Sequence, residues 1–328
     1  MQIRILSAAD VRASIDMPAA IDAMREAFAA LSDGRANVPM RLPLETEHGV
    51  TLFMPAHMTG VGSKSLDEVA GAKVVSVNPG NASAGLPAIH AVVLAIDPVS
   101  GQLRSLMDGT WLTALRTGAI GGLAADLMAR DDARVVALFG AGVQARTQLE
   151  AVRCVRGVTE VRIVASSGAS ADRLVSELDG LEARRVDDPD EAVAGADIVI
   201  AATSSSTPVF DGARIEPGTH VTGVGSFTTD MREVDTTLVQ RARVIVDQRE
   251  AILEEAGDIV GPMRDGDVDA SVMVAEIGDV VLGRVPGRTA SDEITFFKSV
   301  GNAVQDLSVA ARVLEAAERE GLGLLVDL

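Results

Sequence analysis

The pattern of hydrophobic and polar positions divides the chain into two parts. In the first part, short apolar runs lie between prolines and glycines and favour strands joined by hairpins. These strands are expected at residues 40–42, 50–54, 72–77, 89–97 and 103–107. Helical periodicity over residues 17–32 and 110–127 predicts one helix before these strands and one after them. We therefore expect an α+β fold in this part.

From residue 134 onward, the pattern changes to a regular alternation of short apolar runs and helical segments. The apolar runs predict strands at residues 134–139, 160–165, 183–186, 197–202, 219–224 and 243–247. Such an alternation is typical of an α/β fold with a doubly wound parallel sheet. Acidic segments and turns then carry the chain away from the sheet, before a strand-like run at 294–298 and an amphipathic helix at 300–320.

The first strand of this second part runs directly into a glycine turn, Gly140-x-Gly142-x-x-Ala145. Gly140 permits the tight turn, Gly142 lets the backbone approach a pyrophosphate, and Ala145 lets the next helix pack closely on the strand. Free N–H groups at the start of that helix can bind phosphates. The motif predicts a Rossmann-type dinucleotide-binding domain. The alternative is a glycine-rich strand-to-helix turn without a ligand.

The position of this motif in the middle of the chain predicts the domain organisation. A nucleotide-binding domain over residues 119–302 leaves a first domain at residues 1–118, on which the final helix has to pack. We expect a discontinuous α+β domain, residues 1–118 plus 303–328, into which the Rossmann-type domain is inserted. Ligand pockets occur preferentially at such domain interfaces.

Charge and composition exclude several classes of function. The 328 residues carry a formal net charge of −18 and only 2% aromatic residues, whereas nucleic-acid binding needs a basic face and aromatic stacking. We expect small-molecule chemistry instead, and an anionic ligand would need a local cluster of Arg or Lys. Cys154 is the only cysteine, so no intrachain disulfide is possible, and we expect a packed, inert thiol. No signal peptide or membrane-spanning apolar run is evident, which favours a cytoplasmic protein without a membrane partner.

Motifs spread over nearly the whole chain resemble those of the ornithine cyclodeaminase/μ-crystallin family. They are Arg41, Phe53-Met54-Pro55-Ala56, Lys73-Val74-Val75-Ser76, and residues 85–90, 107–110, 113–119, 140–145, 224–227 and 297–301. The resemblance implies two domains and a homodimer formed through the first domain. It also implies bound NAD(H) or NADP(H), and chemistry at the α-carbon of a small amino or imino acid.

Three basic residues are candidates for the substrate site. Lys73 lies inside an apolar strand, where a lysine is either a strand-edge residue in solvent or a buried functional group. The resemblance implies that Lys73 is catalytic, and that it holds the substrate carboxylate or donates a proton with a pKa lowered by desolvation. Arg41 and Arg116 would then clamp the carboxylate with parallel hydrogen bonds. The alternative for either arginine is an ordinary surface or interdomain ion pair.

The resemblance and the strand ends together give candidate cofactor-binding residues. These are Thr117, Gly140, Gly142, Val143, Gln144, Ser166, Ser167, Thr203, Ser204, Ser205, Val224, Gly225, Ser226, Ser299 and Val300. NAD-selective sites usually have Asp or Glu after the second strand, where this chain has Ser166 and Ser167. Small hydroxyls tolerate a 2′-phosphate, but Arg173 is the only basic residue close downstream. We expect NADP(H) or NAD(H), with a slight preference for NADP(H). The alternative is that these serines cap the next helix.

Two positions depart from the cyclodeaminases of that family, which carry an Asp at the position of Phe227 and a Glu at that of Leu52. Neither an aromatic nor an aliphatic side chain can act as a base or bind a side-chain ammonium. The sequence therefore favours an NAD(P)H-dependent reductase of small or cyclic 2-imino carboxylates. The alternatives are an ornithine-type cyclodeaminase, an alanine-type amino-acid dehydrogenase and a non-catalytic NADP-dependent binding protein. No metal site is expected, since the histidines lack metal-ligand spacing.

Overall fold

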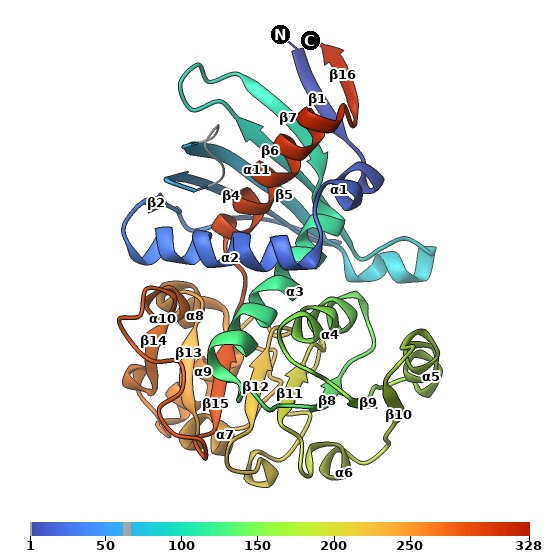
Figure 1. Cartoon of the computed structure of the whole chain (residues 1–328), viewed down its shortest axis with the longest axis vertical. Helices are drawn as coiled ribbons and strands as arrows, with labels where there is room; N and C mark the ends of the chain where they lie inside the picture. The colour runs from blue at the N-terminus through green and yellow to red at the C-terminus, as the bar shows by residue number, and fades with distance from the viewer. Residues whose placement is uncertain (1, 62–66) are drawn as a thin grey trace. The chain divides into compact units, whose positions relative to one another are not determined.

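The computed structural model describes residues 2–61 and 67–328, and the chain forms two compact units (Figure 1). The first unit comprises Met1–Arg116 and Asn302–Leu328, and the second comprises Thr117–Gly301. Helix α3 (Gly109–Met128) includes residues of both units. The second unit contains a parallel sheet flanked by helices, so the predicted α/β class with a Rossmann-type sheet is confirmed.

The first unit contains a mixed, eight-stranded sheet. Its order is β16 (Leu324–Asp327), β1 (Gln2–Leu6), β7 (Leu103–Asp108), β6 (Ile89–Ile96), β5 (Glu68–Val77), β4 (Gly49–Thr59) and β2 (Ala36–Asn37), with β3 (Leu42–Thr46) paired to β4. Strands β4 to β7 pair antiparallel, as the hairpin pattern predicted, and β1 pairs parallel to β7. The strand expected at residues 40–42 is misplaced, because pairing with β4 begins only at Leu42.

Three helices cover one face of this sheet: α1 (Ala8–Ser14), α2 (Met17–Ser32) and α11 (Ala303–Glu320). Alternate residues of β5 are buried, and Lys73 is one of them. Helix α11 packs closely on β5. The close approach is evident at Gly71, where an added Cβ would lie 3.0 Å from Cδ2 of Leu307. Lys73 therefore lies on the face of the sheet that α11 covers.

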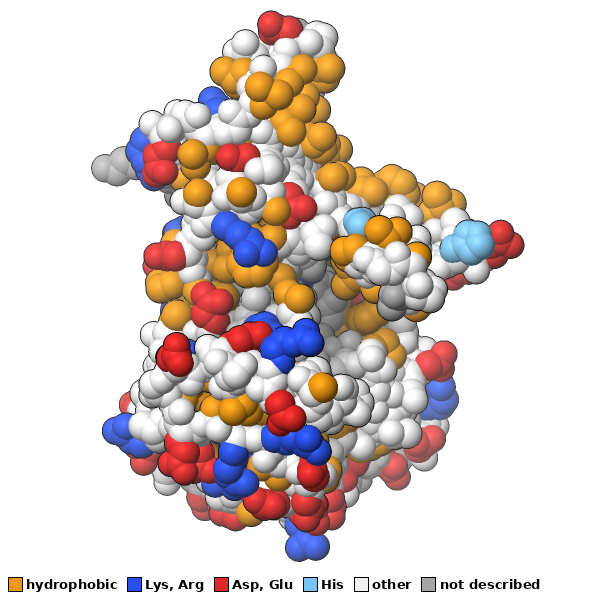
Figure 2. All heavy atoms as spheres, turned by 90° about the vertical axis from the view of Figure 1, so that its right-hand side faces the viewer, with side chains coloured by type: hydrophobic (Ala, Val, Ile, Leu, Met, Phe, Trp, Pro, Cys, Tyr) orange, Lys and Arg blue, Asp and Glu red, His pale blue; other side chains and the backbone are white. Residues whose placement is uncertain are grey.

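The opposite face of the sheet exposes large apolar side chains. Phe53 of β4 pairs with Val74 of β5, which in turn pairs with Val92 of β6, so these side chains share one face. Leu42 of β3 pairs with Phe53, and Leu42, Phe53 and Val92 are all exposed. Figure 2 shows hydrophobic side chains gathered over the first unit. Contiguous exposed apolar surface of this kind usually marks an interaction surface.

The second unit contains an eight-stranded sheet in which every pair is parallel. Its order is β10 (Glu182–Arg185), β9 (Glu160–Val164), β8 (Val135–Phe139), β11 (Ile198–Ala201), β12 (His220–Gly223), β15 (Thr295–Lys298), β13 (Arg243–Val246) and β14 (Met273–Glu276). All predicted strands are present, including the strand-like run at 294–298. The expectation that the chain leaves the sheet after residue 247 is wrong, since β14 returns to its edge. That strand is buried only at alternate positions and ends in Glu276, so it lacks the continuous apolar run that marked strands such as β11 and β13.

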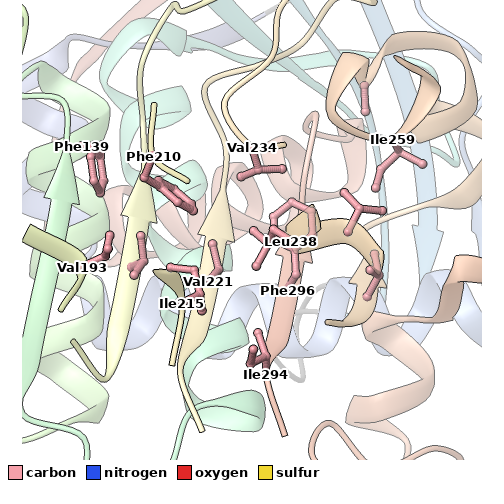
Figure 3. Packing of buried hydrophobic residues seen from close by; sticks show 14 of the residues in the cluster. Phe139, Val193, Phe210, Ile215, Val221, Val234, Leu238, Ile259, Ile294 and Phe296 are labelled. Carbon is pink, nitrogen blue, oxygen red and sulfur yellow. The ribbon is translucent and has the colours of Figure 1, made fainter. Parts of the chain in front are cut away.

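Helices and apolar cores lie on both faces of this parallel sheet. The helices are α4 (Val143–Val155), α5 (Gly168–Glu177), α6 (Pro189–Val193), α7 (Thr236–Arg241), α8 (Arg249–Glu255), α9 (Gly257–Asp265) and α10 (Ile277–Val281). Short 3-10 helices are η2 (Gly212–Arg214) and η3 (Ala270–Val272) in this unit and η1 (Pro79–Ala84) in the first unit. Residues of β8 alternate between two cores: Leu138 belongs to one, and Phe139 belongs to the other (Figure 3). The rings of Phe139 and Phe210 lie 5.1 Å apart. Burial on both faces explains the unbroken apolar run of this strand.

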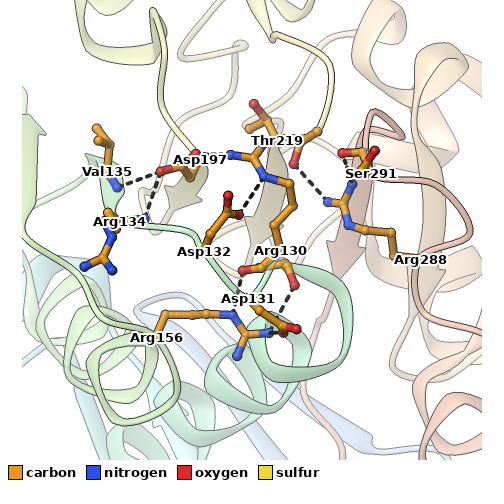
Figure 4. A network of polar contacts seen from close by, with 12 residues as sticks. Arg130, Asp131, Asp132, Arg134, Val135, Arg156, Asp197, Thr219, Arg288 and Ser291 are labelled. Atoms are coloured by element: carbon orange, nitrogen blue, oxygen red, sulfur yellow. Dashed lines mark hydrogen bonds and ion pairs between the residues drawn. The ribbon is translucent and has the colours of Figure 1, made fainter.

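Polar contacts fix the starting edge of the same sheet (Figure 4). The carboxylate of Asp197 accepts hydrogen bonds from the backbone N–H groups of Arg134 (2.8 Å) and Val135 (3.0 Å), at the start of β8. Arg130 forms an ion pair with Asp197, and Nε of Arg156 donates to the carbonyl of Arg130 at 2.9 Å. These contacts position the strand that leads into the glycine turn.

Within the described residues, no helix has both the length and the apolar character needed to cross a bilayer. Cys154 is exposed, so the expectation of a packed thiol is wrong. The reason is the amphipathic character of α4, which buries Ala151 and Val152 and turns the next two residues outward.

Candidate active site

Lys73 lies in the middle of β5, on the face that α11 covers. The residue is only 1% exposed, and its ammonium nitrogen lies 3.0 Å from Oδ1 and 2.9 Å from Oδ2 of Asp306. The interpretation of Lys73 as a strand-edge lysine in solvent is therefore wrong. An isolated charge in an apolar core is costly, so a lysine buried to this degree needs a carboxylate partner.

Arg116 of α3 binds the same carboxylate. Its Nε donates to Oδ1 of Asp306 at 3.0 Å, and its Nη1 donates to Oε1 of Gln305. Arg116 is buried, and Asp306 is 0% exposed. The structure thus brings Lys73 and Arg116 together around Asp306. The ion pair of Arg116 is buried within the first unit and is not an ordinary surface contact.

The start of α11 presents Asp306 to both cations. Asn302 caps the helix in a capping box with Gln305, which fixes the first turn. Sequence reasoning missed Asp306, although a signal was present. Asp306 has helical spacing with the buried residues Ala310 and Val313, so it is a charged residue within an apolar stripe. A buried acid in such a stripe calls for a buried cation.

The electrostatics of this cluster favour proton exchange at neutral pH. Burial and the neighbouring Arg116 cation lower the pKa of Lys73 to about 7, against the opposing effect of Asp306. The charge of Arg41, which is half-buried just before β3, contributes a smaller part of the same lowering of the pKa. Lys73 is therefore present in both protonation states near neutral pH, which suits a general acid or base. When Lys73 is protonated, the buried cations outnumber the carboxylate and leave positive charge for an anionic ligand.

The glycine turn after β8 has the geometry that a dinucleotide requires. Gly140 has a φ of +111°, and a Cβ there would lie 2.5 Å from the carbonyl oxygen of Ala202, so the turn needs glycine. Gly142 precedes α4 with an ordinary φ of −82°, and a Cβ there would meet no protein atom within 4 Å. Protein packing does not explain Gly142, whereas a phosphate close to the backbone does. No side chain caps α4, whose first residues are Val143 and Gln144.

The loop after β9 carries Ser166 and Ser167, both exposed. Ser167 is the N-cap residue of α5, but its side chain makes no capping hydrogen bond, which removes the support for the capping interpretation. Arg185, at the end of β10, lies over this loop. A Cβ added to Gly168 would lie only 2.3 Å from Nη1 of Arg185. Arg185 pairs with Asp187, to which Nε donates at 2.7 Å. Sequence reasoning considered Arg173 and missed Arg185, which is brought in by a neighbouring strand.

The loops after β11 and β12 meet at a buried carboxylate. Glu233 accepts hydrogen bonds from Thr203, Gly225 and Ser226. The structure therefore brings together three of the predicted cofactor-binding residues from two strand ends. Val224 is buried beside them, Ser205 is half-buried and Ser204 is exposed. The sequence contained Glu233 without any indication of this role, because its partners lie on other strands.

A second buried carboxylate organises the loop after β15. Asp247 accepts hydrogen bonds from Oγ of Ser299 (2.7 Å) and from the N–H groups of Val300 and Gly301 (3.0 Å each). The predicted residues Ser299 and Val300 are thus held at the same edge of the sheet, where the strands end. Thr117, in α3, is buried, and its carbonyl accepts from Nε2 of Gln148 in α4.

Phe227 and Leu52, the two positions at which the chain departs from cyclodeaminases, have no ionisable side chain. Phe227 is exposed after β12, and Leu52 is half-buried on β4. Within the described residues, no group of three or more His, Cys, Asp and Glu side chains is arranged to hold a metal ion.

Sequence comparison places this chain in a family of known proteins. A model of the ornithine cyclodeaminase/mu-crystallin family matches residues 1–321, and the chain belongs to that family. The chain is 35% identical to a Delta(1)-pyrroline-2-carboxylate reductase of Bacillus cereus over an alignment 329 positions long, which covers 98% of this chain and 99% of that protein.

Solved structures support the same relationship. The Delta(1)-pyrroline-2-carboxylate reductase of Thermococcus litoralis, in complex with NADH and L-proline, has a TM-score of 0.93 and 37% identity, covering 98% of this chain and 99% of that one. An archaeal alanine dehydrogenase dimer with bound NAD has a TM-score of 0.94 and 34% identity over 100% of both chains. Both similarities extend over both compact units of the chain.

Proposed function

We propose that this protein reduces a small or cyclic 2-imino carboxylate with NAD(P)H. The observation that carries the proposal is the buried cluster of Lys73, Arg116 and Asp306, in which cations outnumber carboxylates. Such a cluster suits a substrate carboxylate and supplies a lysine that titrates near neutral pH. Relatives that are reductases of this substrate class, and the fit of the glycine turn to a dinucleotide, support the same conclusion.

Each residue of the cluster has a distinct role in the proposed reaction. Arg116 and Arg41 bind the substrate carboxylate, while Asp306 keeps Lys73 and Arg116 in place. Bound NAD(P)H supplies the hydride that reduces the imine carbon. Lys73 donates the proton that the imine nitrogen gains, directly or through a water molecule, so that hydride and proton together convert the C=N bond to an amine.

The proposed cofactor site lies along the edge of the parallel sheet where its strands end. Gly140, Gly142, Val143 and Gln144 hold the pyrophosphate, with Thr117 nearby on α3. The loops after β11, β12 and β15 hold the nicotinamide half through Thr203, Ser204, Ser205, Val224, Gly225, Ser226, Ser299 and Val300. In an open parallel sheet, ligands bind outside the carboxyl ends of the strands, at the point where the strand order reverses. Here that point lies between β8 and β11.

We propose NADPH as the preferred cofactor. Ser166 and Ser167 bring no negative charge to the adenosine ribose, and Arg185 lies over the same loop. An arginine at this position suits a 2′-phosphate, whereas an acid would suit the free ribose hydroxyls. Asp187 pairs with Arg185 and neutralises part of the positive charge of Arg185. We therefore include NADH, which lacks the 2′-phosphate, as a second cofactor.

A homodimer formed through the first unit is part of the proposal. The apolar face that carries Leu42, Phe53 and Val92 has the character of an obligate interface. A related archaeal alanine dehydrogenase is a dimer. Light scattering combined with size-exclusion chromatography measures the mass. A mass near twice the chain mass of 34.0 kDa is expected.

An amino-acid dehydrogenase is the second candidate, because the archaeal alanine dehydrogenase is as similar in structure as the pyrroline-2-carboxylate reductase. A panel of Δ1-pyrroline-2-carboxylate, Δ1-piperideine-2-carboxylate, iminosuccinate, and pyruvate with ammonia, each with NADH and NADPH, tests both. Fastest turnover with a cyclic imine supports the reductase, and fastest turnover with pyruvate and ammonia supports the dehydrogenase. Proline formed from ornithine would instead establish a cyclodeaminase, and cofactor binding without turnover a binding protein.

A further inference from the structure

We propose that Glu233 is a positioning residue for the nicotinamide half of the cofactor, an inference that rests on the proposed cofactor site. Its carboxylate is buried and joins the loops that follow two neighbouring strands. Oε1 accepts from the N–H (2.6 Å) and the hydroxyl (2.9 Å) of Thr203 after β11. Oε2 accepts from the N–H groups of Gly225 (2.7 Å) and Ser226 (3.2 Å) after β12. One side chain thus binds four donors from two loops.

Only a carboxylate matches this arrangement of donors. Its two oxygens offer four acceptor positions and no hydrogen, whereas an amide would turn two hydrogens toward N–H groups. The backbone is also shaped around it, because a Cβ added to Gly225 would lie 2.5 Å from Oε1 of Glu233 and 2.0 Å from the carbonyl oxygen of Thr203. Gly225 therefore permits the two loops and the carboxylate to approach one another.

Two further buried charged residues, Asp258 and Lys298, hold Glu233 and the loop after β12 in place. Oδ1 of Asp258 accepts from the N–H groups of Glu233 (2.6 Å) and Val234 (3.0 Å). Lys298 pairs with Oδ2 of Asp258 at 2.9 Å and donates to the carbonyl of Ser226 at 2.8 Å. Ser226 is thereby held at its N–H by Glu233 and at its carbonyl by Lys298. Glu233, Asp258 and Lys298 are each 0% exposed.

The cost of this network indicates a purpose beyond stability. Replacing buried ion pairs with well-packed apolar residues is often neutral or stabilising. Here two carboxylates and one ammonium are buried, and Glu233 and Lys298 bind the loops that follow the strand ends, where a doubly wound sheet binds its ligand. Displacements of about 1 Å in such loops can cost roughly a hundredfold in rate, because the hydride donor must face the acceptor closely. The buried charges of Glu233, Asp258 and Lys298 are therefore suited to fixing these loops in position.

The first test uses the unmodified protein and needs no turnover. Hydrogen–deuterium exchange is measured by mass spectrometry on peptides covering residues 203–206 and 224–227, with and without saturating NADP⁺. The proposal predicts slower exchange in both peptides when NADP⁺ is bound. If NADP⁺ binds by calorimetry but neither peptide changes, the proposal is overturned, whatever the imine substrate proves to be.

The second test is the substitution Glu233→Gln in the full chain. We expect kcat to fall roughly 10- to 100-fold, with the KM for the imine little changed and faster exchange of the two peptides in the cofactor-free protein. The control is Glu276→Gln on β14, because Glu276 also accepts a backbone hydrogen bond, from Arg249 at 2.8 Å. That variant should keep the wild-type kcat. Equal losses of thermal stability in both variants, with kcat unchanged in Glu233→Gln, would show a structural role only.

Discussion

The chain contains three lysines, and two of them form buried ion pairs with aspartate that differ in their surroundings. Lys73 and Lys298 each lie 2.9 Å from a carboxylate oxygen, of Asp306 and Asp258 respectively. Lys73 has Arg116 as a neighbour on the same carboxylate. Lys298 instead donates to a backbone carbonyl, and its partner Asp258 also binds the backbone of a second acid. The same pair of residue types therefore lies in two different electrostatic environments.

The two environments differ in their balance of charge. Around Asp306, two cations face one carboxylate, and the surplus positive charge stands out in a chain with a formal net charge of −18. Around Lys298, one cation faces the two carboxylates Asp258 and Glu233, whose oxygens bind backbone N–H groups. The first cluster can accept an anion, whereas the second is already engaged with its own backbone. A buried lysine is thus informative only together with its partners.

The largest expected effect concerns Lys73. Lys73→Met removes the proposed proton donor and part of the carboxylate site, and we expect kcat for imine reduction to fall by about a thousandfold. Binding of NADPH, followed by its fluorescence, should not change. Lys73→Arg keeps the charge but has a pKa too high to release a proton, so it should retain substrate binding and lose turnover. Arg104→Met, which removes a cation paired with Glu318 in the same unit, is the control. Wild-type turnover in Lys73→Met would remove Lys73 from the mechanism.

The matching substitution in the second cluster should act on stability. Lys298→Met leaves Asp258 and Glu233 buried without their cation, and breaking a buried pair in this way costs about 3–5 kcal/mol of the free energy of unfolding. Urea unfolding measures this loss. Arg184→Met, on the exposed side of β10, should cost less than about 1 kcal/mol. A similarly small cost for Lys298→Met would mean that the two clusters do not differ as described.

The pH dependence of the reaction should follow the pKa of Lys73, which burial and the Arg116 cation lower to about 7. Reduction needs protonated Lys73, so its kcat/KM should be level below about pH 7 and fall above it. Oxidation of the amino-acid product needs neutral Lys73 and should rise through the same pH. Because the Arg116 cation lowers this pKa, Arg116→Met should move both transitions to higher pH. Initial rates between pH 5 and 10 measure them, and a reduction rate that increases through pH 7 contradicts the assignment.

A smaller effect should distinguish Arg185, the cation proposed to bind the 2′-phosphate, from Lys298. We expect Arg185→Gln to raise the KM for NADPH about tenfold while leaving the KM for NADH nearly unchanged, because a charged hydrogen bond to a 2′-phosphate is lost. Arg184→Gln is the matched control, since Arg184 is adjacent and similarly exposed but pairs with Glu191. Equal changes for both cofactors in Arg185→Gln would indicate a structural role for Arg185.

Features set by local sequence could be predicted, and features set by distant contacts could not. The glycine turn at Gly140 was predictable because its geometry depends on adjacent residues. The burial of Lys73 was suggested by the apolar strand around it. Asp306 is 233 residues from Lys73, and no local pattern pairs them before the sheet and α11 come together. The same holds for Glu233, whose role follows from loops on two other strands, and for Arg185, which a parallel neighbour brings to the serine loop.

Whether the positive charge around Asp306 binds a substrate carboxylate can be measured by comparing two imines that differ only in that group. Initial rates of NADPH oxidation are measured with Δ1-pyrroline-2-carboxylate and with Δ1-pyrroline, which lacks the carboxylate. We expect kcat/KM for Δ1-pyrroline to be lower by about a thousandfold or more, because the carboxylate orients the imine in addition to binding it. Comparable kcat/KM values for the two imines would contradict this expectation.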